Sequence, residues 1–563
     1  MSDNEIPEVE RIKRDSRHLR GTIAQGLLDT RTGGISDADK ALLKFHGSYQ
    51  QDDRDLRDER RRQKLEPDHQ FMVRARLAGG VLTTQQWLAF DELATKYSSG
   101  SLRITTRQTF QLHGVQKQNL KKVIAGISQL QASTIAACGD VNRNVMSSAN
   151  PFESPVHAEV TEDARRISAH LSPQTGAYHE IWLDKELIAG GETETEPIYG
   201  KVYMPRKFKI AIAIPPRNDT DVLSNDLGFI AIVENGVLKG YNLSVGGGMA
   251  YTFGNSNTFP RVADVVGYLP KEKIVEAAEA VLVFQRDHGN RSDRKNARLK
   301  YTIEKYGLDY FKSELLRTHK IELEVAKTYQ FETQGDLYGW KQGVDGYWHY
   351  TLFVEGGKLT DLKGITTKTA VREIAQIHDG SFILTGNQNL VIAQVSQANK
   401  AKIEAILRKH QVVESNSISR LRQHSIACAA LPYCGLSFAE AERYLPTVVD
   451  KIDVILKQLG LFEEPISIRM TGCPNGCGRP FLGEIALVGR APGKYNLYLG
   501  ASFRGDRLNK LYKEMLNEEE ILSSLEALLT DYAQNRSDNE RFGDFVIRKE
   551  YVKAVHHATE FHH

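Results

Sequence analysis

The stretch Thr471-Gly472-Cys473-Pro474-Asn475-Gly476-Cys477-Gly478 carries two cysteines with three residues between them. Its proline, glycines and asparagine predict a turn that cannot continue as a regular helix. A second pair, Cys428 and Cys434, lies upstream with five residues between its members, and Cys138 stands alone. Four thiolates from two short loops are the ligand set of a tetrahedral metal centre or of a [4Fe–4S] cluster.

Three other uses of these cysteines stay open on spacing alone. Structural disulfides suit small secreted domains, whereas this chain is large and shows no secretory signal. A structural zinc site usually has a tighter spacing within each pair. Free cysteines are also commonly buried as small apolar residues. The spacing favours the cluster over these alternatives.

The two cysteine pairs also carry a resemblance to a known family. Cys428-Ala-Ala-Leu-Pro-Tyr-Cys434, followed by Thr-Gly-Cys473-Pro-Asn-Gly-Cys477, resembles the signature of sulfite and nitrite reductases that carry sirohaem coupled to a [4Fe–4S] cluster. The resemblance covers nearly the whole chain and is strongest to the haemoprotein (beta) subunits of the bacterial assimilatory, NADPH-dependent branch. It implies one cluster bound by all four cysteines and one sirohaem. It further implies that Cys477 is the axial ligand of the sirohaem iron and that Asn475 lies at the cofactors.

Length and charge limit the class of protein. A chain of 563 residues with 41% apolar residues is long enough for several domains. The 73 Lys and Arg nearly balance the 71 Asp and Glu, which argues against a general binder of nucleic acid or of anionic membranes. No run of about 18 apolar residues predicts a membrane span. The acidic N-terminus shows no targeting pattern, so we expect a cytoplasmic protein.

Two segments far apart in the sequence match each other. Residues 102–115 alternate between largely apolar even positions and polar odd positions, which predicts a strand with one face in a core and one face in a wet site. Residues 382–395 repeat this stretch, and a turn at 79–83 is repeated at 356–360. The match predicts an internal duplication, two α+β half-repeats separated by an inserted domain. The matched positions are Thr105 with Thr385, Gln108 with Gln388, Phe110 with Leu390, and Val115 with Val395.

The resemblance implies an architecture for this duplication. It is an α+β fold of the sulfite/nitrite-reductase type, in which two ferredoxin-like half-repeats form one domain and two larger α/β domains surround the cofactors. We place the half-repeats at 67–135 and 338–415, a sirohaem and substrate domain at 136–337, and a cluster-binding, sirohaem-ligating domain at 416–563. Residues 1–66 are a polar arm, for which composition favours a solvated helix or flexible segment. The resemblance implies that this arm docks a flavoprotein partner.

Cations gather on the first half-repeat only. Its odd-numbered face is polar. At the positions that match Arg103, Arg107, Gln111 and His113, the second copy has Ile383, Asn387, Val391 and Ala393. We therefore place the anionic cofactor against the first copy, with His113 in the pocket wall because a single strand histidine is more often structural than a ligand. Ordinary exposed cations are the alternative. The predicted cofactor-facing residues here are Arg103, Thr105, Arg107, Gln111, His113 and, further along the chain, Arg206.

A second basic stretch follows at 205–216. Its Lys207 and Lys209 share one strand face with two alanines, which leaves room for a bulky group; a surface strand end is the alternative. In the family, the positions matching Arg74, Arg143, Lys207 and Lys209 surround the distal face of the sirohaem and hold the substrate anion. A small dianion in a desolvated site needs several cations, and these can also deliver protons.

The resemblance implies an assimilatory sulfite reductase that reduces sulfite to sulfide with six electrons. Gly246-Gly247-Gly248 lacks the strand–glycine-loop–helix context of a dinucleotide site, so NADPH oxidation is expected on a separate FAD/FMN flavoprotein in a hetero-oligomer. The alternatives are a nitrite reductase or ferredoxin-fed sulfite reductase of the same family, and a non-catalytic Fe–S or zinc-binding module. Cys138 has no predicted role.

Overall fold

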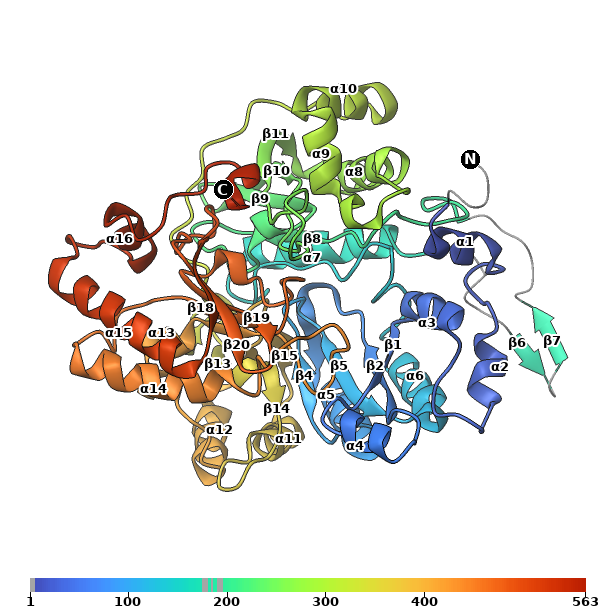
Figure 1. Ribbon diagram of the computed structural model, residues 1–563, viewed down its shortest axis with the longest axis horizontal. Coiled ribbons are helices and arrows are strands. Elements are labelled where there is room, and N and C mark those ends of the chain that lie inside the picture. The colour runs from blue at the N-terminus through green and yellow to red at the C-terminus, as the bar shows by residue number, and fades with distance from the viewer. Residues whose placement is uncertain (1–5, 175–180, 184–185, 190–195, 563) are drawn as a thin grey trace.

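Two five-stranded sheets of the same topology form the base of the molecule (Figure 1). The computed structural model describes residues 6–174, 181–183, 186–189 and 196–562, so residues 1–5 of the predicted arm lie outside the described residues. The first sheet runs β1 (Ser48–Asp52), β2 (His69–Arg74), β5 (Phe110–Val115), β4 (Leu102–Ile104) and β14 (Lys358–Leu359). The second runs β12 (Gly339–Gln342), β13 (Trp348–Leu352), β16 (Leu390–Val395), β15 (Ser381–Leu384) and β3 (Val81–Thr83).

Each sheet takes its last strand from the other half-repeat. Leu359 of β14 lies opposite Leu102, and Leu82 of β3 lies opposite Phe382. A strand exchanged in both directions buries the two apolar faces against one common core, so neither half-repeat is complete alone. The predicted duplication is confirmed, with the two half-repeats forming one domain.

Residues 102–115 form a hairpin, and the single strand predicted for them is wrong. β4 and β5 pair antiparallel, with Arg103 opposite Gln111. Residues 105–109 make the turn, in which Thr105 N donates to Thr109 O (2.9 Å) and Gln108 has a φ of 50°. Gln108 is held in this left-handed conformation by paired hydrogen bonds with the backbone of Ser147, a contact that no local pattern reveals. The second copy makes the same turn at Gln388, with a φ of 70°.

Helices cover the outer face of these sheets. α5 (Thr84–Tyr97) follows the predicted turn at 79–83 and begins with a capping box between Thr83 and Gln86. The ring of Trp87 packs against Phe110 (5.4 Å between centroids) and Phe382 (4.7 Å), one from each copy. The other helices of this layer are α6 (Leu120–Gln129), α11 (Thr367–Ile377) and α12 (Gln397–Lys409).

The two remaining domains also repeat each other, which the sequence did not predict. In one, β8 (Ile210–Ala213) and β9 (Leu227–Glu234) are parallel and are followed antiparallel by β10 (Val237–Val245) and β11 (Asp264–Pro270). In the other, β18 (Ile468–Thr471) and β19 (Ile485–Ala491) are parallel and are followed antiparallel by β20 (Lys494–Leu499) and β21 (Lys510–Leu516), with β17 (Ser425–Ala427) beside β18. The segment predicted as an insertion is therefore the counterpart of the C-terminal domain.

The loops between the parallel strands correspond residue for residue. Asp221 (φ 46°) precedes the short 3₁₀ helix Val222–Ser224, and Arg479 (φ 52°) precedes Pro480–Leu482. Two unlike side chains in the same unusual backbone conformation indicate that the whole unit of half-repeat and α/β domain is duplicated. The helices on these domains are α7 (Pro155–His170), α8 (Ile274–His288), α9 (Leu299–Tyr306) and α10 (Leu308–His319) in the first, and α13 (Arg420–Gln423), α14 (Leu445–Gln458), α15 (Glu518–Asn535) and α16 (Phe542–Arg548) in the second.

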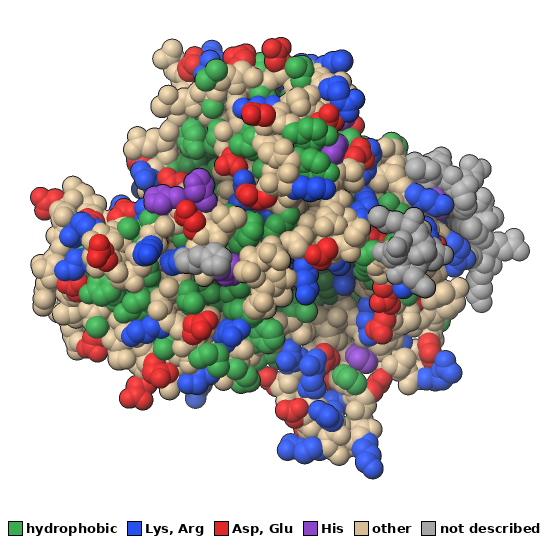
Figure 2. Space-filling model, turned by 45° about the horizontal axis from the view of Figure 1, so that its top comes forward, with side chains coloured by type: hydrophobic (Ala, Val, Ile, Leu, Met, Phe, Trp, Pro, Cys, Tyr) green, Lys and Arg blue, Asp and Glu red, His purple; other side chains and the backbone are tan. Residues whose placement is uncertain are grey.

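The described part of the predicted arm is folded onto the first copy. β1 pairs with β2, and Leu42 and Phe45 are buried. The segment contains α1 (Glu8–Asp15), α2 (Ile23–Leu28), α3 (Asp37–Leu43) and α4 (Arg57–Arg62); the hairpin β6 (Ile181–Leu183) and β7 (Glu186–Ala189) lies at the edge of the molecule (Figure 1). On the face seen in Figure 2, acidic and basic side chains are interspersed, as the balanced composition leads one to expect.

Candidate functional site

The two cysteine loops leave the same edge of one sheet. β17 and β18 are parallel neighbours, and Cys428 follows the first strand while Cys473 and Cys477 follow the second. Gly472 N donates to the Cys428 sulfur (3.4 Å), and Asn475 Nδ2 donates to the Cys473 sulfur (3.5 Å). A Cβ at Gly472 would lie 1.8 Å from Ser437 Oγ, so the close approach of the two loops requires glycine there.

The four predicted ligand cysteines lie within electrostatic reach of one another. Burial raises the pKa of Cys434, and it raises that of Cys473 to about 12. Burial also raises the pKa of Cys428 well above its ordinary value, and the charges of Cys477, Cys473 and Cys434 raise it further. These thiols would stay protonated at neutral pH unless a bound metal centre supplied the compensating positive charge.

A cluster and a single ion place different geometric demands on the four cysteines. In the part of the chain that the structure describes, no three His, Cys, Asp or Glu side chains converge closely enough to hold a single metal ion. A single zinc ion draws its sulfur ligands to about 2.3 Å from one point, whereas a four-iron cube binds each thiolate at a different corner.

Cys477 differs from the other three because its side chain is exposed toward the cations of the first copy. Lys207 and Lys209 both feel the charge of the Cys477 sulfur. Burial, then the charge of Arg206, lowers the pKa of Lys207 to about 7. Burial and the charge of Lys207 hold the pKa of Lys209 well below its usual range. The two ammonium groups thus lie near the Cys477 sulfur.

These two lysines are poised for an anion. Their side chains are partly accessible, although protein surrounds them. Among the described residues, neither ammonium group is paired with a carboxylate. Cations without partners in an enclosed space bind an anion more strongly than they would in water.

Arg74, Gln111 and His113 form a hydrogen-bonded chain along one wall. With the Gln111 amide oriented to satisfy both neighbours, its oxygen accepts from Arg74 Nε (2.9 Å) and its nitrogen donates to His113 Nε2 (3.1 Å). His113 Nδ1 then donates to Gln51 Oε1 (3.2 Å), and the ring packs on Tyr433 between the cysteines of the first pair. Burial and the charge of Arg103 keep the pKa of His113 well below its ordinary value, so His113 is a neutral wall residue.

Arg143 lies close to Arg74, since both side chains contact the segment Ala137–Cys138. It donates to Gly139 O (3.1 Å) and Ala137 O (3.2 Å), and its Nη2 donates to the Tyr49 hydroxyl (3.4 Å). Cys138, which had no predicted role, is buried against Arg74, whose Nη1 donates to the Cys138 sulfur (3.0 Å). Cys138 therefore helps to orient one of the predicted substrate arginines.

Some of the remaining predicted residues have nitrogen atoms available for a ligand, and others hold the surrounding backbone in place. Arg103 donates to Glu442 (2.7 Å), but its Nε and Nη1 are buried without a hydrogen-bond partner among the described residues. Arg107 donates from Nη1 to the Asn225 side chain and from Nη2 to backbone carbonyls, and its buried Nε has no partner among the described residues. Thr105 accepts from Arg107 N (3.1 Å) and so shapes the turn. Arg206 lies 3.8 Å from Asp140.

These observations fit the group expected from the sequence. Buried guanidinium nitrogens without partners suit the carboxylates of a sirohaem, and the exposed Cys477 suits a sulfur that reaches beyond its own cluster.

A separate cleft of about 920 Å³ lies between β12, α12 and the C-terminal domain and contains none of the predicted site residues. The sequence missed Tyr49, Gln51 and Glu442, because their partners come from distant segments.

Comparison with known proteins identifies two family models. The ferredoxin-like half domain of nitrite and sulfite reductases matches residues 62–130 and 341–410, which are the two half-repeats. The nitrite and sulfite reductase 4Fe-4S domain matches residues 162–323. None of the five cysteines lies within that second match, which covers the counterpart domain that carries Lys207 and Lys209.

Curated proteins of known name are similar over the full length. The chain is 57% identical to the sulfite reductase [NADPH] hemoprotein beta-component of Oceanobacillus iheyensis, over 99% of this chain and 96% of that protein. It is 54% identical to the protein of the same name from Bacillus subtilis, over 100% of this chain and 98% of that one. Among solved structures, Mycobacterium tuberculosis NirA is similar with a TM-score of 0.77 and 22% identity, covering 97% of both chains, which supports the fold. No helix among the described residues is long and apolar enough to cross a membrane.

Proposed function

This chain belongs to the nitrite and sulfite reductase family, and we propose that it is the haemoprotein of an NADPH sulfite reductase. Relatives above 50% identity that align end to end share the name of that component. The enzyme is an oxidoreductase that reduces sulfite to sulfide, taking up six electrons and seven protons to give hydrosulfide and three waters. The single observation that carries this function is the exposed Cys477, which lies between one buried cysteine, two half-buried cysteines and two lysines that have no carboxylate partner among the described residues.

The chain binds one [4Fe–4S] cluster and one sirohaem. Cys428, Cys434, Cys473 and Cys477 would hold the cluster, and Cys477 would also bind the sirohaem iron. Arg103, with its two unpaired nitrogens, and Arg206 bind sirohaem carboxylates. When bound, the two groups supply electron transfer and a metal that takes the sulfur of sulfite.

The cationic wall binds and orients the substrate. Arg74, Arg143, Lys207 and Lys209 offset the charge of sulfite where water is largely excluded. Arg74 and Arg143 are fixed by their hydrogen bonds to Cys138, Gln111 and Tyr49, so they need little reorganisation when the anion enters. The ammonium groups of Lys207 and Lys209 are not fixed by such hydrogen bonds among the described residues, so they can follow the anion as its oxygens leave.

The same lysines supply protons. A group whose pKa lies near the working pH gives up a proton readily and is recharged readily. Burial lowers the pKa of Lys207 to about 7, which places it in that range. We assign Lys207 as the side chain that passes protons to the departing oxygen atoms, directly or through water.

A second component delivers the electrons. The name beta-component, carried by the relatives, implies a partner subunit in a complex. We infer that the partner is a flavoprotein that oxidises NADPH and that it docks near the N-terminal segment. Arg54 Nη1 donates to the carbonyls of Cys434 (3.1 Å) and Ser437 (3.3 Å), so this segment lies directly over a cluster loop.

Spectroscopy with turnover tests this function. The purified protein is expected to show a haem-type absorption spectrum, iron beyond that of one cluster, and reduction of sulfite by a chemically reduced viologen. Parallel assays with nitrite measure the preference between the two anions. Iron without a haem band, or zinc, would contradict the proposal, and faster turnover of nitrite than of sulfite would reassign the substrate.

A further inference from the structure

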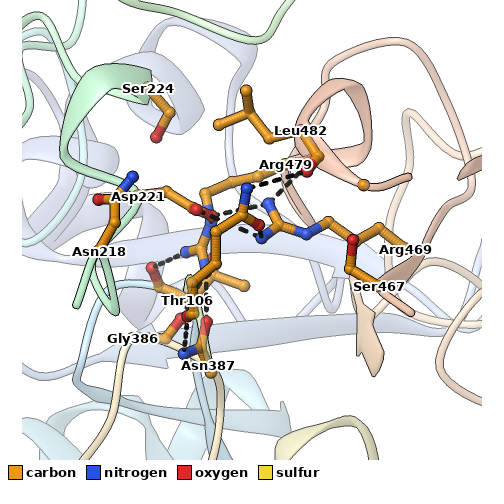
Figure 3. Close-up of polar contacts among 12 residues, drawn as sticks. Thr106, Asn218, Asp221, Ser224, Gly386, Asn387, Ser467, Arg469, Arg479 and Leu482 are labelled. Carbon is orange, nitrogen blue, oxygen red and sulfur yellow. Dashed lines mark hydrogen bonds and ion pairs between the residues drawn. The ribbon is translucent and has the colours of Figure 1, made fainter. Parts of the chain in front are cut away.

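Asp221 lies at the centre of a buried network between the two copies (Figure 3). Its carboxylate accepts hydrogen bonds from Arg469 Nη1 (2.7 Å) and from Arg479 Nε. The relative exposures are 0% for Asp221, 1% for Arg469 and 6% for Arg479. Because water does not screen this network, removing one partner would leave a buried charge without compensation.

Arg479 connects the cysteine loop to both half-repeats. It follows Cys477 by two positions and has a φ of 52°, a conformation that a residue with a side chain keeps only where contacts enforce it. Its Nη1 donates to Thr106 O (2.9 Å), and its Nη2 donates to Gly386 O (2.8 Å). These carbonyls occupy the same turn position in the two half-repeats, so the guanidinium lies where the copies meet (Figure 3).

Thr106 also fixes the other end of the same short segment. Its hydroxyl donates to the carbonyl of Cys477 (3.0 Å). Arg469 Nη1 donates to the carbonyl of Arg479 (3.0 Å) as well as to Asp221. The backbone from Cys477 to Arg479 is therefore held at both ends, and Asp221 orients both arginines.

We propose that Asp221 is a positioning residue for the Cys477 thiolate. It acts through Arg479 and Arg469 and touches neither substrate nor cofactor. The proposal rests on the proposed function, because a thiolate that meets two metal centres at once tolerates little displacement. A loss of Asp221 would shift the Cys477 backbone without removing any metal ligand.

The test uses the full-length protein purified with its cofactors. Asp221→Asn keeps the size of the side chain and removes its charge; Arg479→Lys keeps the charge and removes the fork that reaches both half-repeats. Asp91→Asn is the matched control, because Asp91 is buried, pairs with Lys368 (2.9 Å) and Arg372, and joins the two half-repeats away from the cysteine loop. Iron content, the electron paramagnetic resonance spectrum of the coupled centre, melting temperature and sulfite turnover are measured for each.

We expect all three variants to melt at lower temperature, and only Asp221→Asn and Arg479→Lys to change the resonance spectrum. Their turnover per bound iron should fall about 10- to 100-fold, the usual effect of losing a residue that orients a metal ligand. An unchanged spectrum and turnover in Asp221→Asn, with a melting temperature like that of Asp91→Asn, would overturn the proposal.

A second pair of variants decides the matter if Asp221→Asn does not fold with its cofactors. Arg479→Lys and Thr106→Val each remove one restraint on the Cys477 segment and leave the aspartate in place. An altered spectrum in both supports the proposal, and a native spectrum in both overturns it. A failure of the proposed function is distinguishable, because the unaltered protein would then lack the coupled spectrum.

Discussion

The two copies of the duplicated unit share one backbone and carry opposite chemistry. Ser148 N donates to Ile212 O in the first copy, and Cys428 N donates to Met470 O in the second, so the two loops correspond. By the same alignment Asp219 corresponds to Cys477. Where the second copy has Cys428 and Cys477, the first closes the same loops with a hydrogen bond from Ser148 Oγ to Asp219 (2.7 Å).

The cations are distributed in the opposite way. Each predicted site residue of the first copy that is paired below has an uncharged counterpart in the second copy. The two copies therefore contribute different chemistry to the site. The pairs are Arg74 with Thr351, Arg103 with Ile383, Arg107 with Asn387, Gln111 with Val391, His113 with Ala393, Arg143 with Gln423, Lys207 with Pro465 and Lys209 with Ser467.

The cleft of about 920 Å³ lies on the second copy at the place that corresponds to the cationic site of the first. Tyr350, Gln423, His424 and Pro465 line it, and they are counterparts of residues around the cationic site. The cleft thus has uncharged residues at the counterparts of Arg143 and Lys207, although Lys341, Arg408, Arg420 and Arg541 also line it. The lysines of the first copy lie near Cys477 of the second, and the proposed active site is placed between them.

The largest effect is expected from exchanging a cysteine of the second copy. Cys477→Ser removes the sulfur proposed to serve both metal centres, so haem absorbance, cluster iron and sulfite reduction should all be lost. Ser148→Ala, at the counterpart of Cys428, should cost about 1.5–3 kcal/mol of stability through its bond to a carboxylate and leave both cofactors bound. Iron analysis and absorption spectra check both variants. A Cys477→Ser protein with native iron content and turnover would contradict the assignment of the metal-binding sulfur atoms to the second copy.

The next effect concerns the cationic wall. Arg143→Gln gives the first copy the residue of the second, and losing charged hydrogen bonds of about 1.5–3 kcal/mol should raise the KM for sulfite about 10- to 100-fold. Gln423→Ala in the second copy should leave the KM within about twofold. Steady-state kinetics at constant ionic strength measure both; equal KM changes at the two positions would show that the copies share substrate binding.

The pH dependence of binding should follow Lys207. Its pKa is lowered to about 7 in the free protein, so its positive charge is present below that pH and is lost above it. The KM for sulfite should therefore rise above pH 7, by at most about tenfold per pH unit. Lys207→Arg, which stays charged, should remove this rise and leave only the proton equilibrium of sulfite itself. Identical KM–pH profiles for the two proteins would exclude Lys207 as the titrating group.

The final prediction concerns the stability of the second copy rather than the chemistry of the site. Burial lowers the pKa of His424 to about 3, so the folded protein holds this ring neutral while the unfolded chain binds a proton below about pH 6.5. Stability should fall as the pH drops from 6.5 toward 3, by at most about 1.4 kcal/mol per pH unit. His424→Asn, the residue type of its counterpart Asn144, should flatten that slope. Urea unfolding at several pH values measures it, and an unchanged slope would assign the acid sensitivity to other groups.

The sequence alone determined the chemistry of the site. The two cysteine pairs and the contrast between Arg103 and Ile383 are visible in the chain, because metal ligands and phosphate- or carboxylate-binding cations permit few replacements. The half-repeats could be recognised in the sequence because both copies have a glutamine at the same position of the turn, Gln108 and Gln388, where the backbone has a positive φ. The family resemblance then led from these residues to the fold and function.

The tertiary structure decided what held these residues in place. Residues 102–115 looked like one strand because both arms of the hairpin keep the same alternation, and only the bonds from Gln108 to Ser147 reveal the turn. Tyr49 and Gln51 lay in a segment whose composition suggested an arm. The duplication of the α/β domains left no sequence match, since apolar cores accept many sequences of similar volume. Asp221 and Arg479 correspond in backbone yet differ in charge, and they form an ion pair only because the two copies fold against each other.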